Sequence, residues 1–246
     1  MAKKDKKDRS RSDSKLRVLV VEDEESFVEA LQVGLAKEGF EVFIARDGAE
    51  ALEQFAAVSP DLILLDQMLP RMSGIDVCRF IRAQSDVPII MVTAKSEEID
   101  TVVALEVGAD DYVTKPYRMR ELVARMRAVL RRAPLAGAGG DEQDADAPEE
   151  LGGLRLEPET RRAYVRGDEI HLRRKEFELL RLLMENGGRV LTRDVLIDRV
   201  WGSDYVGDTK TLDVHIKRLR SQIEEDPSNP LLITTIRGVG YRFDGI

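Results

Sequence analysis

The chain has 246 residues, enough for two domains of ordinary size, and its 43% hydrophobic and 34% charged residues are typical of a folded globular protein. The single cysteine, Cys78, excludes a disulfide framework and a cysteine metal site, and no apolar stretch of about twenty residues is present to span a membrane. We therefore expect a cytoplasmic protein with no membrane partner.

The net charge of −8 is unevenly distributed. Residues 1–15 contain seven basic and three acidic residues and no apolar pattern, which predicts a disordered basic tail. Residues 133–150 contain six acidic and no basic residues and predict a flexible linker, whereas residues 151–246 contain 17 basic and 16 acidic residues. The acidity belongs to the region before residue 151, so it does not exclude nucleic-acid binding by the C-terminal part.

Residues 16–132 alternate short apolar runs with helical segments. The runs end before or at polar residues, and continuous apolar runs are typical of strands buried on both faces of a parallel sheet. Asp47 and Ser73 are expected to cap the helices that follow them. Strands are predicted at 18–23, 41–45, 62–66, 88–93 and 112–113, and helices at 26–38, 48–57, 74–84, 97–107 and 118–132. This order predicts a doubly wound α/β fold with five parallel strands.

Three carboxylates stand at the ends of two of these strands. Glu22 and Asp23 follow the first strand and Asp66 ends the third, so they should meet where the winding direction reverses. Each acid alone is more often a helix cap or a solvated group, but clustered carboxylates repel one another and call for a cation. Oxygen ligands suit magnesium, Lys115 would supply positive charge for a phosphoryl group, and Asp66 could be a covalent nucleophile.

The motifs around these residues resemble the receiver domain of two-component response regulators over residues 16–132. They are Val-Val-Glu22-Asp23-Glu, Leu-Leu-Asp66-Gln-Met-Leu-Pro, Met-Val-Thr93-Ala and the segment from Gly108 to Pro116. The resemblance implies that a histidine kinase phosphorylates Asp66. It also implies that magnesium is held by Asp23, Asp66 and the Met68 carbonyl, with Glu22 acting through water.

The same resemblance assigns roles to the remaining site residues. Thr93 and Lys115 would contact the phosphoryl group, and Thr93 and Tyr112 would form the switch. The Lys115–Pro116 bond is expected to be cis. Gln67 departs from the family, which usually has an apolar residue there.

Residues 151–246 have a different pattern. Short strands are predicted at 154–156, 162–165 and 169–172, with 166–168 as a hairpin turn, and helices at 174–184, 193–200 and 209–223, followed by a hairpin of 231–235 and 241–243. In the last helix Leu212, Ile216, Leu219 and Ile223 mark one apolar face. The basic residues on its other faces suit a DNA major groove, although a solvated charged surface is the commoner meaning of such a face.

This region resembles the α+β winged helix-turn-helix domain of OmpR/PhoB-type regulators. The matching segments are 174–180, 198–202, 211–220 and 235–241. The resemblance makes 209–223 the recognition helix for double-stranded promoter DNA and assigns the loop 202–208 to RNA polymerase. The implied DNA contacts are Lys210, Thr211, Val214, His215, Lys217, Arg218, Arg220, Thr235 and Arg237. Arg173 stands where a threonine often caps the first helix of this domain, and a slightly frayed start is expected there.

The resemblance also implies a homodimer that forms on phosphorylation. The expected interface residues are Glu106, Asp110, Asp111, Arg125, Arg127 and Arg132. Thr101 replaces a basic residue common in the family, which is expected to leave Glu121 without its usual partner. The segment 201–212 resembles phosphate-starvation regulators of actinobacteria.

Two alternatives stay open at the level of the sequence. One is an atypical regulator that binds DNA without phosphorylation. The other is an aspartyl-phosphate phosphohydrolase, although such enzymes commonly need a second acid where this chain has Met68.

Overall fold

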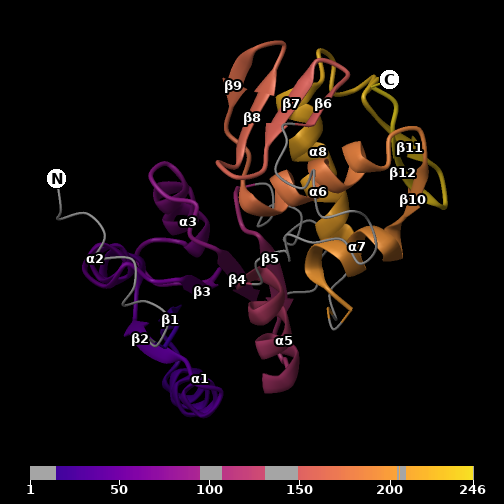
Figure 1. Cartoon of the computed structure of the whole chain (residues 1–246). Coiled ribbons are helices and arrows are strands. Elements are labelled where there is room, and N and C mark those ends of the chain that lie inside the picture. The colour runs from indigo at the N-terminus through magenta and orange to yellow at the C-terminus, as the bar shows by residue number, and fades with distance from the viewer. Residues whose placement is uncertain (1–14, 95–106, 131–148, 204, 206–208, 246) are drawn as a thin grey trace, which may run out of the picture. The chain divides into compact units, whose positions relative to one another are not determined.

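The computed structural model describes residues 15–94, 107–130, 149–203, 205 and 209–245. These residues form two compact units, one built mainly from the chain up to Met126 and the other from the chain beyond it (Figure 1). The N-terminal and C-terminal units have separate sheets.

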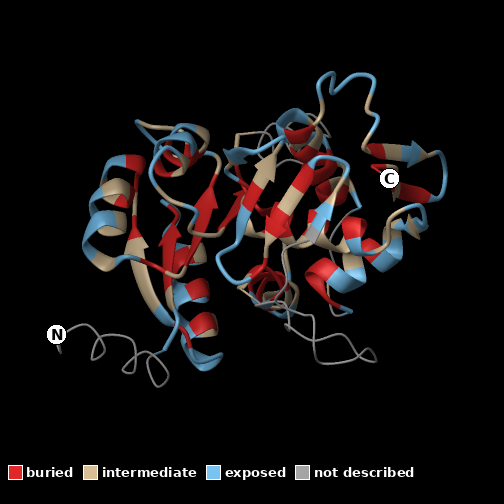
Figure 2. Cartoon of the chain, turned by 45° about the horizontal axis from the view of Figure 1, so that its top comes forward, coloured by how far each residue is buried: buried red, intermediate tan, exposed pale blue. Residues whose placement is uncertain are grey.

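The N-terminal unit is a doubly wound sheet, as the sequence predicts. Its strands are β1 (Arg17–Val21), β2 (Glu41–Ala45), β3 (Leu62–Asp66), β4 (Ile89–Thr93) and β5 (Asp111–Thr114). All neighbours pair in parallel in the order β2-β1-β3-β4-β5. Every residue of β3 and β4 is buried, which is why these strands are continuous apolar runs (Figure 2). The winding direction reverses between β1 and β3.

The helices of this unit are α1 (Glu25–Lys37), α2 (Gly48–Val58), α3 (Gly74–Arg82) and α5 (Met119–Leu130). Both predicted caps are confirmed. Asp47 Oδ1 accepts hydrogen bonds from the amides of Ala49 and Glu50 at 2.8 and 3.0 Å, and Ser73 Oγ accepts one from Asp76 N at 3.2 Å. Residues 97–106 of the predicted fourth helix lie outside the described residues.

The C-terminal unit combines a four-stranded antiparallel sheet, three helices and a three-stranded sheet. The first sheet contains β6 (Glu149–Leu151), β7 (Leu154–Glu157), β8 (Arg162–Val165) and β9 (Asp168–Ile170). The helices are α6 (Arg174–Glu185), α7 (Arg193–Trp201) and α8 (Lys210–Ile223), and β10 (Val190–Thr192), β11 (Ile233–Ile236) and β12 (Gly240–Phe243) form the second sheet. The predicted helices and the closing hairpin are confirmed to within a few residues.

Two short strands escaped the sequence analysis. β6 starts at Glu149, so the last two residues of the expected linker pair with β7 in an antiparallel ladder. β10 has only three residues and pairs with β12, far along the chain. Both strands have only three residues, which is too short for a recognisable apolar pattern, and both are held by backbone pairing with their partner strands.

The C-terminal core lies under α8. Leu212, Ile216, Leu219 and Ile223 are each at most 1% exposed, as their spacing predicts, and they pack in one cluster with Phe177 and Leu180 of α6. At the start of α6, the amide of Arg173 donates to Glu176 Oε2 at 2.9 Å, so Glu176 supplies one half of a capping box and satisfies the backbone amide of Arg173.

Candidate functional site

The three strand-end carboxylates converge. One oxygen from each of Glu22, Asp23 and Asp66 lies within 4.8 Å of the others. Glu22 and Asp66 are 2% and 5% exposed, whereas Asp23 is exposed. An open pocket of about 650 Å³ surrounds the group, lined by Glu22, Asp23, Glu24, Phe27, Asp66, Met68, Ala94, Lys115 and Pro116. The sheet therefore places an acidic, solvent-accessible pocket at its switch point, as the sequence predicts.

Lys115 neutralises part of this charge. Its Nζ donates to Asp66 Oδ2 at 2.5 Å and to Glu22 Oε2 at 2.6 Å. The Lys115–Pro116 bond is cis, as expected, and Lys115 N donates to Thr93 O at 2.7 Å, which ties the loop to β4. The ammonium also lies 4.2 Å from the centre of the Phe27 ring, a cation–π contact that the sequence analysis missed.

The pocket shifts the pKa values of its groups. Burial raises the pKa of Glu22, and the charge of Asp66 adds to this while the hydrogen bond from Lys115 opposes it. Burial lowers the pKa of Lys115, but its hydrogen bonds to Asp66 and Glu22 outweigh burial and raise the pKa overall. Lys115 is therefore a cation at neutral pH. With three carboxylates against one ammonium, the pocket favours further positive charge.

Asp66 is held from both sides. The amide of Met68 donates to Asp66 Oδ1 at 2.8 Å. On the backbone side Gly74 approaches so closely that a Cβ atom there would lie 1.9 Å from Asp66 O. Gly74 is thus a site residue that the sequence analysis treated only as a helix start.

We predict that Gly74→Ala lowers the free energy of unfolding of the N-terminal unit by about 1–3 kcal/mol, the usual range for overpacking. Gly74 is the first residue of α3, and helix propensity alone would predict a gain of up to about 1 kcal/mol from the same change. Calorimetry on the whole chain decides between the two effects. A lower transition temperature for Gly74→Ala would show that the close approach to Asp66 dominates, and a higher one would show that helix propensity dominates.

Thr93 and Tyr112, the expected switch residues, are 2% and 7% exposed and lie on neighbouring strands. Thr93 ends β4 at the same sheet edge as Asp66.

Gln67 follows Asp66, and its Oε1 is buried with no hydrogen-bond partner among the described residues. The family departure at Gln67 thus leaves an unsatisfied polar atom next to the site.

The expected dimer residues that the structure describes are largely engaged within the N-terminal unit. Asp110 is 5% exposed and pairs with Arg82 at 2.5 Å, and Asp111 pairs with Arg125 at 3.3 Å. Arg125 also pairs with Glu121 at 3.0 Å, so Glu121 has a partner on its own helix, which is not the partner that a basic residue at position 101 would supply. Of the other expected interface residues, Arg127 is exposed, whereas Glu106 and Arg132 lie outside the described residues, as does Thr101.

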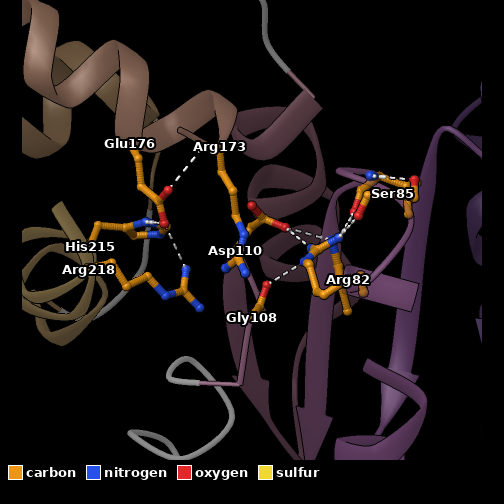
Figure 3. Close-up of polar contacts among 10 residues, drawn as sticks. Arg82, Ser85, Gly108, Asp110, Arg173, Glu176, His215 and Arg218 are labelled. Atoms are coloured by element: carbon orange, nitrogen blue, oxygen red, sulfur yellow. Dashed lines mark hydrogen bonds and ion pairs between the residues drawn. The ribbon is translucent and has the colours of Figure 1, made fainter. Parts of the chain in front are cut away.

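Arg82, which the sequence does not mark as a site residue, binds the segments that lead into β4 and β5. Besides Asp110, its guanidinium donates to the carbonyl oxygens of Gly108, Ser85 and Val87 at 2.7, 3.3 and 2.5 Å (Figure 3). Asp110 Oδ2 also accepts from Ile89 N at 2.9 Å. Asp110 therefore has a structural role in the monomer, which a dimer contact would have to preserve or replace.

Three of the expected DNA contacts on α8 are buried. Thr211, Val214 and His215 are 1%, 6% and 0% exposed. The His215 ring lies 5.3 Å from the Trp201 ring, and its Nδ1 is 4.0 Å from Glu176 Oε1 (Figure 3). His215 is three residues after Leu212 and four before Leu219, so it shares their inward face. The expected DNA contacts of Thr211, Val214 and His215 therefore fall on side chains that are buried in the free protein.

The basic residues of α8 differ in their exposure and in the hydrogen bonds that they make within the unit. Lys217 is exposed, and Arg218 is half-buried with Nη1 3.5 Å from Glu176 Oε1. Arg220 donates through Nε and Nη2 to Ile233 O at 3.0 and 2.6 Å and to Thr235 Oγ1 at 2.8 Å. Burial lowers the pKa of Arg220. Arg220 thus fastens β11 to α8, whereas Arg237 and Thr235 in the β11–β12 hairpin are exposed.

A second polar group joins α8 to the hairpin. The Tyr241 hydroxyl donates to Asp213 Oδ1 at 2.6 Å, and Arg193 of α7 pairs with the same oxygen. Burial and the hydrogen bond with Asp213 raise the pKa of Tyr241 to about 12. The sequence does not mark these three residues as a group, because they become neighbours only in the folded unit.

A parallel sheet with an acidic, lysine-containing pocket at its switch point, followed by a winged helix-turn-helix unit, defines a signalling regulator with a receiver and a DNA-binding output. The comparisons agree. Residues 18–127 match the family "Response regulator receiver domain" and residues 167–243 match "Transcriptional regulatory protein, C terminal". The chain belongs to the OmpR/PhoB-type two-component response regulators.

Its relatives are similar along almost their whole length. Sensory transduction protein RegX3 of Mycolicibacterium smegmatis is 58% identical and aligns over 93% of this chain and 99% of that protein. Alkaline phosphatase synthesis transcriptional regulatory protein PhoP of Bacillus subtilis is 46% identical, over 93% and 96%. A solved RitR mutant is 28% identical with a TM-score of 0.71, over 93% of this chain and 99% of that chain.

As a member of this family the chain is a transcription regulator that works with a histidine kinase and promoter DNA, and it is not a metabolic enzyme. The phosphohydrolase alternative is thereby rejected. In the described part of the chain, no helix has the length and apolar character needed to cross a lipid bilayer.

Proposed function

We propose that Asp66 is the phosphoacceptor. A carboxylate oxygen of Asp66 attacks the phosphorus of a kinase phosphohistidine, the P–N bond breaks, and an acyl phosphate forms. The observation that carries this is the Lys115 ammonium 2.5 Å from Asp66 Oδ2, beside two further carboxylates. Lys115 is placed to follow the phosphoryl oxygens and stabilise their charge. Incubation with acetyl phosphate and magnesium, followed by mass spectrometry, tests the proposal.

We propose magnesium as the metal of this pocket. The donors are all oxygen atoms, and the three carboxylates face a single cation, so the donor set fits a hard divalent ion. Asp23, Asp66 and the Met68 carbonyl would hold the ion, with Glu22 acting through water. When bound, magnesium neutralises charge on the transferred phosphoryl group.

The change at Asp66 is proposed to reach the output unit through Thr93 and Tyr112. The Thr93 hydroxyl bonds a phosphoryl oxygen, and the side chain of Tyr112 moves with it, biasing a two-state equilibrium. The phosphorylated form dimerises through the face that contains β5 and α5. Arg127 is exposed there, and Arg125 can exchange partners between Asp111, Glu121 and a second protomer.

The domain limits that fit this function are a basic tail at 1–15, a receiver at 16–132, a linker at 133–150 that gives way to β6 at Glu149, and a DNA-binding domain at 151–246. The linker lets a symmetric receiver pair hold two output domains on DNA, which makes the second binding event intramolecular and can raise avidity about 100-fold.

We further propose that the loop 202–208 meets RNA polymerase. The site of action is the cytoplasm, because promoter DNA is there.

The contacts proposed for DNA are those that the fold leaves accessible. Lys210 and Lys217 meet phosphates, Arg218 approaches bases, and Thr235 and Arg237 bring the hairpin to the minor groove. Arg220 acts mainly by holding the hairpin in place.

The stimulus is proposed to concern phosphate supply, because the 46% identical PhoP is named for alkaline phosphatase synthesis.

Binding of the phosphorylated protein to its promoter is expected to weaken by about a thousandfold between roughly 50 and 200 mM salt, since some six neutralised phosphates release their counterions. Fluorescence anisotropy with a labelled duplex at several salt concentrations measures the slope. Affinity that stays constant over this range would contradict a phosphate-contacting interface.

The remaining alternative is an atypical regulator that binds DNA without phosphorylation. No mass gain with acetyl phosphate, together with unchanged DNA affinity, would favour it. The intact set of Asp66, Thr93 and Lys115 supports the phosphorylated mechanism.

A further inference from the structure

The proposed metal ligand Met68 lies on the loop between β3 and α3. The loop runs from Gln67 to Ser73, and the amide of Gly74 closes it by donating to Gln67 O at 3.1 Å. Met68 is 72% exposed, so side-chain packing does little to fix its position. The place of its carbonyl oxygen therefore depends on the polar contacts that hold the loop.

The loop is fastened to the start of α2. Arg71 Nη2 donates to Asp47 Oδ2, while Asp47 Oδ1 caps that helix. A Cβ atom added at Gly48 would lie 2.8 Å from Met72 Cβ, so the loop and the first turn of α2 are in close contact. The side chain of Asp47 is only 8% exposed, although that of Arg71 is 74% exposed. Because the carboxylate is partly desolvated, this ion pair is stronger than one between two exposed side chains.

The backbone of Arg71 is a second sign that this contact holds the loop. Its φ angle is +67°, in the left-handed region, which a residue with a Cβ atom adopts at a cost in free energy. Such a conformation persists where neighbouring contacts enforce it, and residues of this kind gather at ligand sites. The ion pair with Asp47 is a contact that can enforce it.

Met68 is also held from the side of the pocket, because its amide donates to Asp66 Oδ1 at 2.8 Å. That carboxylate is the group that the proposed function modifies, and the present inference rests on that function. Arg71 and Asp47 do not line the pocket, so their ion pair stays in place while Asp66 reacts. The ion pair is thus the contact of the loop that is independent of the chemistry.

We infer that Arg71 and Asp47 are positioning residues of the magnesium site: their ion pair holds the loop so that the Met68 carbonyl stays within reach of the ion. Neither residue touches the ion or the phosphoryl group. Without the pair, magnesium binding has to order the loop, which costs conformational entropy and lowers the affinity.

The test is Arg71→Ala in the full chain, with magnesium chloride as the probe and no kinase present. The half-saturating magnesium concentration should rise about tenfold, the lower end of the usual effect of losing a group that orients a metal ligand. Charge alone predicts the opposite sign, because removal of a cation near an acidic pocket should tighten magnesium binding. Calorimetry measures this concentration from the shift that magnesium produces in each variant's own transition temperature.

Asp47→Asn removes the same ion pair from the other side. Asparagine caps a helix about as well as aspartate does, so the start of α2 should be kept. The half-saturating concentration should rise as much as in Arg71→Ala, and the double variant should show no further rise. The matched control is Arg79→Ala, which removes an arginine of α3 that pairs with Asp76 at 3.2 Å and should leave magnesium binding unchanged.

The possible results separate this role from the metal proposal itself. A wild-type transition that magnesium does not shift overturns the metal proposal and this inference with it. A wild-type shift together with unchanged or tighter binding by Arg71→Ala overturns only the role of the ion pair. Losses that add up in the double variant would show that Arg71 and Asp47 act separately, and they would overturn that role as well.

Discussion

Asp66→Ala is expected to abolish the mass gain that acetyl phosphate and magnesium produce in the wild-type chain, and with it phosphorylation-dependent dimerisation. The variant lacks the only nucleophile proposed for the pocket, so the loss should be complete rather than graded. Intact-mass measurement and size-exclusion chromatography on the same samples give the two readouts.

The matched control for this experiment is Asp76→Ala. Asp76 is also an aspartate of the N-terminal unit, but it lies on the exposed face of α3 and pairs with Arg79 at 3.2 Å. An exposed pair of this kind contributes little, so the control should keep both the mass gain and the dimer. A mass gain that persists in Asp66→Ala would place the phosphoryl group on another residue.

Arg218→Ala is expected to weaken binding to a cognate duplex by about 1–3 kcal/mol and to relax the preference at one base position, because Arg218 is proposed to contact base edges. Lys217→Ala should weaken all duplexes alike and reduce the salt slope by about one, since a phosphate contact has no sequence information. Anisotropy titrations with a duplex selected from a random pool, and with single-base variants of it, distinguish the two effects.

The charge-matched control is Arg162→Ala. Arg162 lies in β8, outside the recognition helix and the hairpin, and pairs with Glu169 at 3.5 Å on an exposed surface. It should bind the duplex as the wild type does. Equal losses in Arg218→Ala and Arg162→Ala would indicate a general charge effect and refute base readout by Arg218.

The dimer proposal has a physical consequence at Asp110 and Asp111. Both carboxylates already have arginine partners within the N-terminal unit, at 2.5 and 3.3 Å. Breaking either buried pair without replacement would be strongly unfavourable. A phosphorylation-driven interface on this face should therefore add contacts to Arg125 and Arg127 rather than dissolve the pair of Asp110 with Arg82.

Amino-acid order alone determined the local features of this protein. Continuous apolar runs predicted five buried strands, capping residues predicted the starts of α2 and α3, and a three-to-four spacing predicted the buried face of α8. The carboxylates at strand ends predicted the acidic pocket, because parallel strands bring their carboxyl ends to one edge. Each of these inferences needs only a short stretch of chain or one rule of sheet topology.

Only the tertiary structure decided which polar side chains are partners. Arg82 and Asp110 are 28 residues apart, and the Arg220 side chain bonds a carbonyl 13 residues later. The family resemblance assigned His215 to the DNA surface, yet in the folded unit His215 is buried on the inward face of α8. The sequence equally does not reveal that the Tyr117 hydroxyl is buried and has no hydrogen-bond partner among the described residues. These features depend on distances between segments that are remote along the chain, and no local pattern encodes such distances.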